Sequence, residues 1–383
     1  MLKKPQVLSR ARCTTEGVEM KVIHLITNLG IGGAETMLYQ RLMISKERGE
    51  ESSHMVCYFN DGPFVQQVKD LGFTVMKISG FLRGYDPVGF YQFFKLVKKE
   101  QPTCLHASLW SASIIARLVG YFTKIPTICD IHGDPEHHGI IRNSIDRLVP
   151  YKYVMFIAVT SAIVSSIKKW MPGAQVQVIH NGVNQQYFLQ NDTREFSFSQ
   201  IKQEKIIITV CGRLIPLKRY HLFLHAINLL IKSGQKGIHG LIIGEGPEKA
   251  NLVALSYKLG IERYVTFVGQ QKNMPDWYAL SDVLLSCSET EALSLVVLEA
   301  MSVGVVVVAT ASTNAGEVIK HQKNGLLLQT SKIQDIAEAL SRLASNPLFR
   351  KRLGAAAEAT IEKKFDIHIV TSRYKKLYKS LLR

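Results

Sequence analysis

The stretch from residue 283 to residue 317 constrains the fold most, because its pattern predicts a strand, a helix and a second strand in direct succession. Residues 283–287 form a short apolar run between polar residues, which is typical of a buried strand in a parallel sheet. Apolar residues then recur at helical spacing, so we expect a helix from near Ser294 to Gly304 and a second strand at residues 305–309. Ligands of such units bind beyond the carboxyl ends of the strands.

Two acidic residues accompany the predicted start of this helix: Glu291 lies in the loop before it and Glu299 lies within it. A helix N-terminus presents unpaired N–H groups and the positive end of a dipole, which favour a bound anion. Carboxylates repel an anion but accept hydrogen bonds from hydroxyl groups, so the combination favours a phosphorylated ligand rich in hydroxyls, such as a nucleotide-sugar. The alternative is that Glu291 is a surface acid and Glu299 a solvated helix residue, because acids near helix starts are common.

The length of 383 residues predicts two domains, each large enough for its own core. A hydrophobic content of 46% and a charged content of 20% are typical of a globular protein and exclude a disordered chain. No apolar run reaches the length needed to span a bilayer. Residues 1–19 carry several basic side chains but no apolar core, so we interpret them as a mobile leader rather than a secretory signal and expect a cytoplasmic protein.

The formal net charge of +16 indicates anionic partners, such as phosphates or an acidic lipid surface. The charge is dispersed and no nucleic-acid-binding signature accompanies it, so we expect no nucleic-acid partner. Basic and aromatic residues lie together at residues 90–99 and 168–171, where an amphipathic helix could lie on an anionic membrane surface. The alternative is a core-facing helix with a solvated lysine side. Six scattered cysteines without a C-x-x-C pair predict reduced thiols and no metal site.

The first half of the chain alternates apolar runs with helical patterns, which predicts a doubly wound parallel sheet. After the first strand, a loop containing Gly32 and Gly33 would let the backbone approach a phosphate, although a simple tight turn is the alternative. His132 follows a predicted strand and would therefore lie at the ligand-binding edge of the sheet. The predicted strands are residues 20–27, 54–59, 73–78, 103–107, 125–131, 155–159 and 176–179, and the predicted helices include residues 64–71, 87–99, 111–122 and 161–171.

The second half repeats this alternation. A predicted strand at residues 205–210 leads into a loop that carries Arg213 and Lys218, before a helix at residues 220–233. Two cations at a helix start oppose the helix dipole, so a bound diphosphate explains them better than a loop without a ligand. The predicted organisation is a first domain at residues 20–185, a linker at 186–204, a second domain at 205–364 and a last helix at 365–383.

Residues 291–304 resemble the E-x7-E signature of retaining glycosyltransferases of glycosyltransferase family 4 (GT4, glycosyl transferases group 1). The family usually has E-G-F-G-L-x-x-L-E-A-M-A-x-G, where this chain has EALSLVVLEAMSVG. Both loop glycines of the family pattern are replaced, by Ala292 and Ser294, and the aromatic residue is replaced by Leu293. These replacements narrow the loop that approaches the donor sugar, so the resemblance does not identify the sugar.

Other segments resemble further motifs of the family. Residues 32–35 match its G-G-A-E, His132 is similar to the histidine of its T-x-H, and residues 212–218 match its G-R-L-x-x-x-K position by position. Gly244 begins a segment similar to the G-x-G-P that lies near the nucleotide base. Val268 lies in a segment similar to the one that contacts the base through backbone groups.

The resemblance implies a GT-B fold, in which two Rossmann-like domains face a central cleft and the C-terminal helix crosses back to the first domain. It also implies that Glu299 binds ribose hydroxyls, Glu291 orients the sugar, and Arg213 and Lys218 hold the diphosphate with backbone N–H groups of residues 293–295. The predicted catalytic residues are His132, Glu291, Arg213 and Lys218, and the predicted donor-binding residues are Gly32, Gly33, Arg213, Lys218, Gly244, Val268, Leu293, Ser294, Leu295 and Glu299.

The implied reaction moves a sugar from a nucleoside diphosphate, with uridine diphosphate as the commonest donor in the family, to a glycan or lipid-linked acceptor in cell-surface polysaccharide synthesis. No cofactor or metal is expected, because the cations take the role of a metal. The protein would act in the cytoplasm, peripherally at the inner face of the membrane. Two alternatives remain: a catalytically idle homologue that binds sugar nucleotides, and a GT-B epimerase or phosphorylase. Slow hydrolysis of the donor without acceptor would indicate an active transferase.

Overall fold

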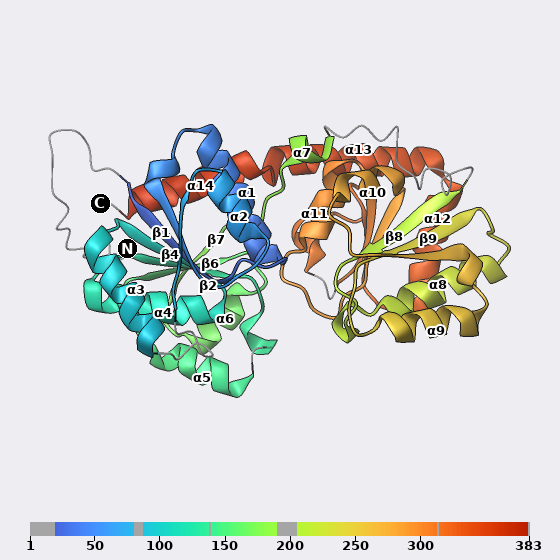
Figure 1. Cartoon of the computed structure of the whole chain (residues 1–383). Coiled ribbons are helices and arrows are strands. Elements are labelled where there is room, and N and C mark those ends of the chain that lie inside the picture. Colours follow the sequence, from blue (N-terminus) through green and yellow to red (C-terminus); the bar gives the residue numbers. More distant parts are fainter. Residues whose placement is uncertain (1–19, 80–86, 138, 190–204, 312–313, 382–383) are drawn as a thin grey trace. The chain divides into compact units, whose positions relative to one another are not determined.

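A computed structural model describes the protein over residues 20–79, 87–137, 139–189, 205–311 and 314–381. The chain divides into two compact units (Figure 1): a first unit of Met1–Asn181 with Ile367–Arg383, and a second unit of Gly182–Asp366. The predicted leader at residues 1–19 and most of the predicted linker lie outside the described residues.

The first unit is built on a seven-stranded parallel sheet in the order β3-β2-β1-β4-β5-β6-β7. The central strands are buried along their length, which explains why continuous apolar runs predicted them. The strand β1 lies between β2 and β4, where Val22 pairs with His54 of β2 and with Cys104 of β4. The strands are β1 (Val22–Asn28), β2 (His54–Asn60), β3 (Thr74–Lys77), β4 (Cys104–Ser108), β5 (Thr127–Ile131), β6 (Val154–Ala158) and β7 (Gln175–Val178).

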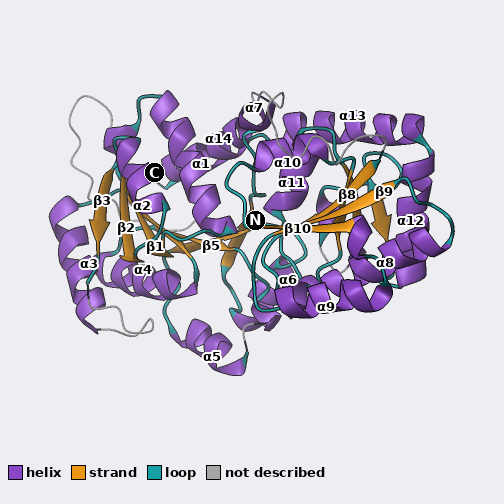
Figure 2. Cartoon of the chain, turned by 45° about the vertical axis from the view of Figure 1, so that its right-hand side comes forward, coloured by secondary structure: helices purple, strands orange, loops and turns teal. Residues whose placement is uncertain are grey.

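Helices cover both faces of this sheet (Figure 2). On one face α1 packs against α14, the last helix of the chain, and on the opposite face α4 packs against β1 and β4 (Figure 1). The helix α14 thus belongs to the first unit although it follows the whole second unit in the sequence. The helices are α1 (Gly33–Glu47), α2 (Phe64–Asp70), α3 (Pro87–Glu100), α4 (Trp110–Thr123), α5 (Ile140–Leu148), α6 (Val164–Trp170) and α14 (Ile367–Ser380).

The second unit is built on a six-stranded parallel sheet in the order β10-β9-β8-β11-β12-β13. Its main core joins the sheet to α8 and α12 through aliphatic side chains such as Val283, Val308 and Leu340. The strands are β8 (Ile206–Cys211), β9 (Ile238–Ile243), β10 (Val265–Gly269), β11 (Val283–Ser286), β12 (Val306–Thr310) and β13 (Leu326–Leu328). The helices are α7 (Gln185–Leu189), α8 (Tyr220–Lys232), α9 (Lys249–Leu259), α10 (Met274–Leu280), α11 (Leu295–Ser302), α12 (Ile333–Ser345) and α13 (Pro347–Lys364).

The predicted fold class is confirmed: each unit is a doubly wound parallel sheet of the Rossmann type, and the last helix returns to the first unit. In both sheets the first strand of the unit lies between its second and its fourth strand. This reversal of strand order is the topological switch point, where ligands of such sheets bind. Among the described residues, no helix has the length and apolar character that a membrane crossing requires.

Two local predictions differ from the structure. The predicted boundary at residue 185 falls after the observed one at Asn181, and the helix α7 occupies the start of the predicted linker. Gln185 donates a hydrogen bond from Nε2 to the Ser302 carbonyl at 3.0 Å, and the Phe188 ring lies 5.8 Å from the Tyr278 ring. These contacts hold α7 to the second unit, and the polar composition of the segment did not predict them.

The helix α5 was not predicted, because its polarity is inverted. Its buried residues are Asn143 and Asp146, whereas Ile140, Ile141 and Leu148 are about four-fifths exposed, at 77%, 77% and 81%. Asn143 donates to the Pro135 carbonyl at 2.9 Å, and Asp146 accepts hydrogen bonds from Trp110 and Arg117 at 2.8 Å each. Polar contacts therefore hold this helix to the unit, and its apolar side chains remain on the surface.

Candidate functional site

The loops that follow β8 and β11 form the candidate site of the second unit, because these two strands flank its switch point. The loop after β8 contains a short 3-10 helix, Pro216–Lys218, and leads directly into α8. The loop after β11 leads into α11. The backbone N–H of Glu289 donates to the Leu217 carbonyl at 2.8 Å, so the two loops contact each other through backbone as well as side chains.

Arg219 links the two loops most extensively, although the sequence analysis gave it no role. Its Nε donates to the Cys287 carbonyl at 2.9 Å and its Nη2 donates to the Ser288 carbonyl at 3.3 Å. Nη2 also reaches the Ser331 hydroxyl at 3.0 Å. Arg219 has a positive φ of 50°, a conformation that its long-range contacts must hold in place. The sequence signal was its position in the cationic loop, but only the fold shows which carbonyls it binds.

Lys218 and Glu291 form an ion pair across the two loops. The Lys218 Nζ lies 2.9 Å from both carboxylate oxygens of Glu291, and both side chains are mostly buried, at 17% and 21% exposure. Ser288 also donates to this carboxylate at 3.0 Å, and Asn314 donates to the Glu291 carbonyl at 2.8 Å. The sequence predicts that Lys218 binds the diphosphate and Glu291 the sugar of a donor, and the structure brings the two side chains together. Arg213, by contrast, is exposed.

Glu299 lies on α11 and points to the neighbouring helix α10. Its Oε2 accepts a hydrogen bond from the Tyr278 hydroxyl at 2.8 Å. Burial raises the pKa of the Glu299 carboxyl, and the hydrogen bond from Tyr278 opposes that rise. Tyr278 is fully buried and was not identified from the sequence, since one tyrosine in an apolar helix carries no functional signal. The pair offers carboxylate oxygens that can accept hydrogen bonds from hydroxyl groups.

The start of α11 has the properties that the sequence predicted. The helix begins at Leu295, one residue after the expected start, and Ser294 precedes it in an extended conformation without a capping bond from its side chain. The first turn has no acidic residue, so the positive end of the helix dipole is not neutralised there. Leu293 and Ser294 are largely buried, at 5% and 8% exposure, which keeps this part of the loop compact.

Gly244 and Val268 are predicted to lie near a nucleotide base; Gly244 directly follows β9, and Val268 is the next-to-last residue of β10. A Cβ atom at Gly244 would lie 2.0 Å from the Gly212 carbonyl oxygen, and its φ of +141° is one that favours glycine. Gly244 therefore allows the loops after β8 and β9 to touch. The Val268 carbonyl accepts a hydrogen bond from the Gln271 side chain at 2.9 Å. Contact with a base remains a prediction for both residues.

In the first unit, Gly32 and Gly33 lie at the switch point, where β1 leads into α1. Gly32 precedes the helix, and its carbonyl accepts the Thr36 N–H at 2.9 Å. A Cβ atom at Gly32 would lie 2.5 Å from a carboxylate oxygen of Glu35, so this glycine lets the Glu35 side chain fold back over the turn. Gly33 is the exposed first residue of α1. A tight turn is thus present, and phosphate binding there remains a prediction.

His132 follows β5 directly, in the first unit, as the sequence predicted. Burial lowers the pKa of His132 to about 4, and the attraction of Asp130, which favours the protonated ring, opposes this shift only in part. The imidazole is therefore neutral at pH 7 and can accept or donate a hydrogen bond, but it carries no charge. Its catalytic role remains a prediction. Among the described residues, no group of three or more His, Cys, Asp or Glu side chains is arranged to hold a metal ion.

Comparison with known families identifies two matching models that together span most of the chain. Residues 31–187 match the model described as Glycosyltransferase Family 4, and residues 191–360 match the model described as Glycosyl transferases group 1. The boundary between the two matches falls close to the boundary between the two structural units.

Individual proteins are more distantly similar. The N-acetyl-alpha-D-glucosaminyl L-malate synthase of Bacillus anthracis is 26% identical over 71% of this chain and 72% of its own length. The lipopolysaccharide core biosynthesis glycosyltransferase LpsE of Rhizobium meliloti is 27% identical over 45% of this chain and 50% of its own length. Crystal structures of Anabaena Alr3699/HepE with UDP and with UDP-glucose align to 94% of this chain and 100% of theirs, with a TM-score of 0.83 and 20% identity. At that identity the structural likeness establishes the fold alone.

Proposed function

This chain belongs to the glycosyl transferases group 1 family, and from that premise we propose that it transfers a sugar from a uridine diphosphate sugar to a glycan or lipid-linked acceptor, with retention of configuration. We place this activity in cell-surface polysaccharide synthesis. The choice of donor is supported by the structural neighbour that binds UDP and UDP-glucose. The choice of acceptor class is supported by the relative named for lipopolysaccharide core biosynthesis.

The observation that carries the proposal is the pairing of Lys218 with Glu291 across the switch point of the second unit. The ammonium of Lys218 is suited to bind phosphate and the carboxylate of Glu291 to bind sugar hydroxyls, and the two groups lie 2.9 Å apart. The diphosphate and the sugar of one nucleotide-sugar could therefore bind next to each other there. In the proposed complex Arg213 and Lys218 hold the diphosphate with the start of α11, Glu291 orients the sugar, and Glu299 accepts hydrogen bonds from the ribose.

The proposed reaction proceeds on one face of the sugar. The bond between the anomeric carbon and the diphosphate oxygen breaks, and a bond from that carbon to the acceptor oxygen forms. The proton of the acceptor hydroxyl passes to the leaving phosphate. The protein's contribution is to stabilise the negative charge that develops on the diphosphate, through Arg213, Lys218 and the dipole of α11. We propose that these cations serve without a metal, and that neutral His132 contributes a hydrogen bond to the sugar.

The thermal stability of the protein with nucleotides tests the donor site. A ligand at about 100 times its Kd adds about 2.7 kcal/mol to the free energy of unfolding, which raises the Tm. We expect UDP and a UDP-sugar to raise the Tm of the wild type, with little shift in Glu299→Ala and an unchanged shift in Glu338→Ala. Glu338 is an exposed acid on α12 and serves as the matched control. Stabilisation by another base's diphosphate would reassign the donor, and no shift with any nucleotide would overturn the donor site.

Hydrolysis of the bound donor distinguishes an active transferase from an idle homologue. The replacement of two loop glycines by Ala292 and Ser294 is the observation that favours the idle alternative. We expect slow release of free sugar from a UDP-sugar without acceptor, and loss of that release in Lys218→Met. Binding of UDP-sugars without any release, with candidate acceptors present or absent, would establish the idle alternative.

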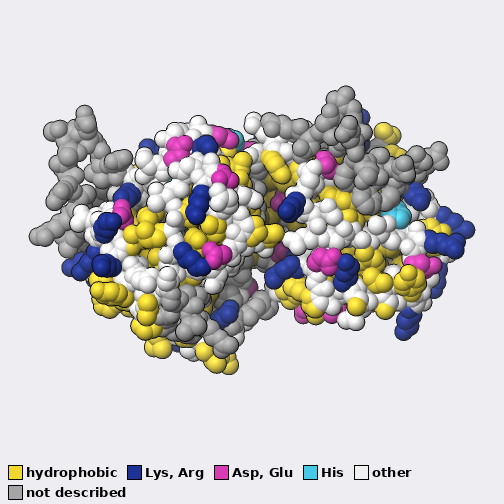
Figure 3. All heavy atoms as spheres, in the orientation of Figure 1, with side chains coloured by type: hydrophobic (Ala, Val, Ile, Leu, Met, Phe, Trp, Pro, Cys, Tyr) yellow, Lys and Arg dark blue, Asp and Glu magenta, His cyan; other side chains and the backbone are white. Residues whose placement is uncertain are grey.

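For the acceptor side, we propose that the first unit docks on an anionic membrane through α5. The exposed side chains of Ile140, Ile141 and Leu148 lie on the same short helix as the exposed cations Arg142 and Arg147. Figure 3 shows hydrophobic side chains along the lower edge of the first unit, over α3, α4 and α5. Apolar side chains that enter the lipid boundary, next to cations that face anionic headgroups, are the pattern of an interfacial helix. A lipid-linked acceptor would then lie close to the enzyme.

Co-sedimentation with vesicles tests this docking. We expect binding to vesicles that contain an anionic phospholipid, weaker binding to neutral vesicles, and a large loss of binding in the double variant Ile140→Ser with Ile141→Ser. Leu348→Ser is the matched control, because Leu348 is 81% exposed but lies on α13 in the second unit. Equal binding by the α5 variant and the wild type would overturn the docking surface without affecting the proposed donor.

A further inference from the structure

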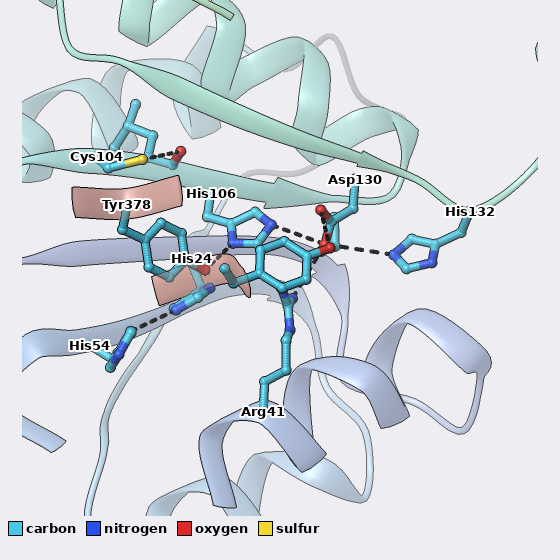
Figure 4. Close-up of polar contacts among 11 residues, drawn as sticks. His24, Arg41, His54, Cys104, His106, Asp130, His132 and Tyr378 are labelled. Atoms are coloured by element: carbon cyan, nitrogen blue, oxygen red, sulfur yellow. Dashed lines mark hydrogen bonds and ion pairs between the residues drawn. The ribbon is translucent and has the colours of Figure 1, made fainter. Parts of the chain in front are cut away.

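A cluster of buried polar side chains lies in the first unit between the sheet and α14 (Figure 4). At its centre is Asp130, the fourth residue of β5, whose side chain is 1% exposed. The side chains around this carboxylate come from α1, β4, α14 and the loop directly after β5. We refer to them together as the Asp130 cluster: Arg41 of α1, His106 and Ser108 of β4, Asp130, His132 and Tyr374 of α14.

Asp130 has specific partners on both carboxylate oxygens. Its Oδ1 accepts a hydrogen bond from the Tyr374 hydroxyl at 2.9 Å. Its Oδ2 accepts from Arg41 Nη2 and from the Ser108 hydroxyl, each at 3.3 Å, and lies 2.9 Å from His106 Nε2. The Arg41 guanidinium also stacks 4.2 Å from the centre of the Tyr374 ring. The carboxylate is therefore fixed from α1, β4 and α14 at once.

These contacts keep Asp130 ionised inside the unit. Burial opposes the charged form, but the attraction of His106 and Arg41 outweighs it, so the pKa of Asp130 lies well below its usual range. Burial also opposes the charged form of His132, and there the attraction of Asp130 does not outweigh it. The pKa of His132 is therefore lowered to about 4, and its ring is neutral at pH 7. A fixed anion thus faces a neutral histidine that can choose between two tautomers.

The geometry favours one of these tautomers. The His132 Nε2 lies 3.9 Å from Asp130 Oδ2, and Figure 4 shows it directed toward that carboxylate. Among the described residues Nε2 is a buried nitrogen without a hydrogen-bond partner. A proton on Nε2 is attracted by the carboxylate, whereas the lone pair of an unprotonated Nε2 would be repelled. The same logic explains how an aspartate orients the histidine of a catalytic triad.

We propose that Asp130, fixed by Arg41 and Tyr374, is a positioning residue that holds His132 with its proton on Nε2 and leaves Nδ1 to accept a hydrogen bond from the donor sugar. Two hydrogen bonds fix this carboxylate from helices outside the sheet, one from Arg41 and one from Tyr374. The C-terminal helix α14 therefore takes part in positioning His132. The contact of His132 with a sugar rests on the proposed transferase function. The choice of tautomer does not, because it depends only on groups within the first unit.

Histidine-selective nitrogen NMR tests the tautomer directly. The protein has 12 histidines, so it is labelled with 15N-histidine and the signals of His132 are identified by their loss in His132→Gln. In the wild type at pH 7 we expect a neutral ring with the proton on Nε2. In Asp130→Asn we expect that preference to be lost. Tyr374→Phe removes one hydrogen bond to Asp130 but keeps the ring over Arg41, so it should fold and shift the His132 signals in the same direction by less.

The control variant loosens α14 without touching Asp130. Lys375 lies next to Tyr374 on the same helix, and its Nζ forms an ion pair with Glu50. Lys375→Met should leave the His132 tautomer unchanged even if it lowers the Tm. Unchanged His132 signals in both Asp130→Asn and Tyr374→Phe, or a wild-type proton on Nδ1, would overturn the proposal. Equal shifts in Tyr374→Phe and Lys375→Met would also overturn it, because the effect would then come from loosening the helix.

Turnover of the UDP-sugar separates this proposal from the proposed function. We expect Asp130→Asn to lower kcat by roughly tenfold to a hundredfold, the range that applies to the orienting partners of metal-bound histidines, with little change in KM. If no nucleotide binds at all, the transferase function fails while the NMR result still decides the tautomer. If donor turnover is intact in Asp130→Asn, the donor site stands and the positioning role of Asp130 is wrong.

Discussion

The two units share a reversal of strand order but have interiors of different chemistry. In the first unit, β1, β2 and β4 carry His24, His54 and His106 on their buried faces, and the nearest nitrogens of His24 and His54 are 3.0 Å apart. In the second unit, the equivalent interior of β11 and β12 is made of side chains such as Leu284 and Val308. The first unit also has an aliphatic core, with side chains such as Leu38 and Val56, so the two units differ in the directional polar contacts that the first one adds.

The polar interior has a consequence that an aliphatic one lacks. Hydrogen bonds to His106 and Asp130 specify where Tyr378 and Tyr374 of α14 must lie, at 2.6 Å and 2.9 Å. Aliphatic packing would accept small shifts of the helix, whereas buried polar groups are strongly penalised when their partners move. The first unit therefore gains a defined position for its last helix and becomes sensitive to any change that leaves one of these groups unpaired.

The largest expected effect comes from removing the central anion of this polar interior. Asp130→Ala should lower the free energy of unfolding by about 3–5 kcal/mol, because it leaves the Arg41 guanidinium buried without its partner. Urea denaturation measures the loss, and hydrogen exchange of peptides from β4 and β11 shows in which unit it occurs. Ser108→Ala removes one long hydrogen bond, of 3.3 Å, from an uncharged donor to the same carboxylate, and should lower the free energy of unfolding by only about 1.5 kcal/mol. Equal losses in the two variants would contradict the electrostatic explanation.

A truncation in the aliphatic interior should have a comparable effect with a different dependence on pH. Leu284→Ala removes a fully buried side chain from β11 and should lower the free energy of unfolding by about 2–5 kcal/mol. Since no charged group is left unpaired, we expect the same loss at pH 7 and at pH 5. Urea denaturation at the two pH values measures it, and a loss that grows at pH 5 would show that this core also depends on titrating groups.

Acidification should weaken the first unit more than the second. The pKa values of His54 and His132 are lowered to about 4 by burial, against an ordinary value of 6.5. Between pH 6.5 and pH 4 these histidines bind more protons in the unfolded chain than in the folded one. They therefore do not reduce the free energy of unfolding above pH 6.5, and they reduce it progressively as the pH falls toward 4. Each of the two histidines should lower the free energy of unfolding of the first unit by about 1–2 kcal/mol at pH 5.

The second unit provides the comparison for this pH effect. It contains His239, with a pKa lowered to about 4, and the less buried His221, with a pKa lowered by burial. Hydrogen exchange at pH 7 and pH 5, corrected for the intrinsic rates, should show a larger loss of protection in β1, β2 and β4 than in β8 and β11. His54→Phe should reduce the loss in the first unit, and an identical loss in both units would refute the distinction.

The smallest effects are expected on the surface, where the two units do not differ. Glu245, in the loop after β9, and Lys249, the first residue of α9, form an exposed ion pair in the second unit, with both side chains more than 40% exposed. Lys249→Ala should change the free energy of unfolding by a few tenths of a kcal/mol at most, and high salt should remove the effect. A change above about 1 kcal/mol in urea denaturation would mean that this pair matters to the loop after β9 beyond its charge.

Much of the candidate site was predictable, because its residues belong to local patterns. The strand, loop and helix from β11 to α11 were located within one or two residues, since apolar runs and helical spacing are read over short windows. The residue types of the loop after β8 indicated an anion. The ion pair between Lys218 and Glu291 could not be predicted in this way, because 73 residues separate the two side chains.

The helices α5 and α7, which the sequence pattern does not predict, have one property in common. The helix α5 has polar residues inside and apolar residues outside, so the usual relation between hydrophobicity and burial does not hold there. The helix α7 lies in a polar segment and is held by Gln185 and Phe188 through contacts with distant residues. In both helices, contacts with other parts of the unit override the preference of the local sequence.

Local pattern was sufficient to establish an alternating βα chain with two sheets and a ligand-binding loop in front of α11, because periodicity and glycine-containing turns act over a few residues. The tertiary structure decided which side chains meet. Asp130 receives Arg41 from 89 residues away and Tyr374 from 244 residues away, and no spacing rule relates such positions. Their meeting depends on strand order and on the return of α14 to the first sheet, which are properties of the folded chain as a whole.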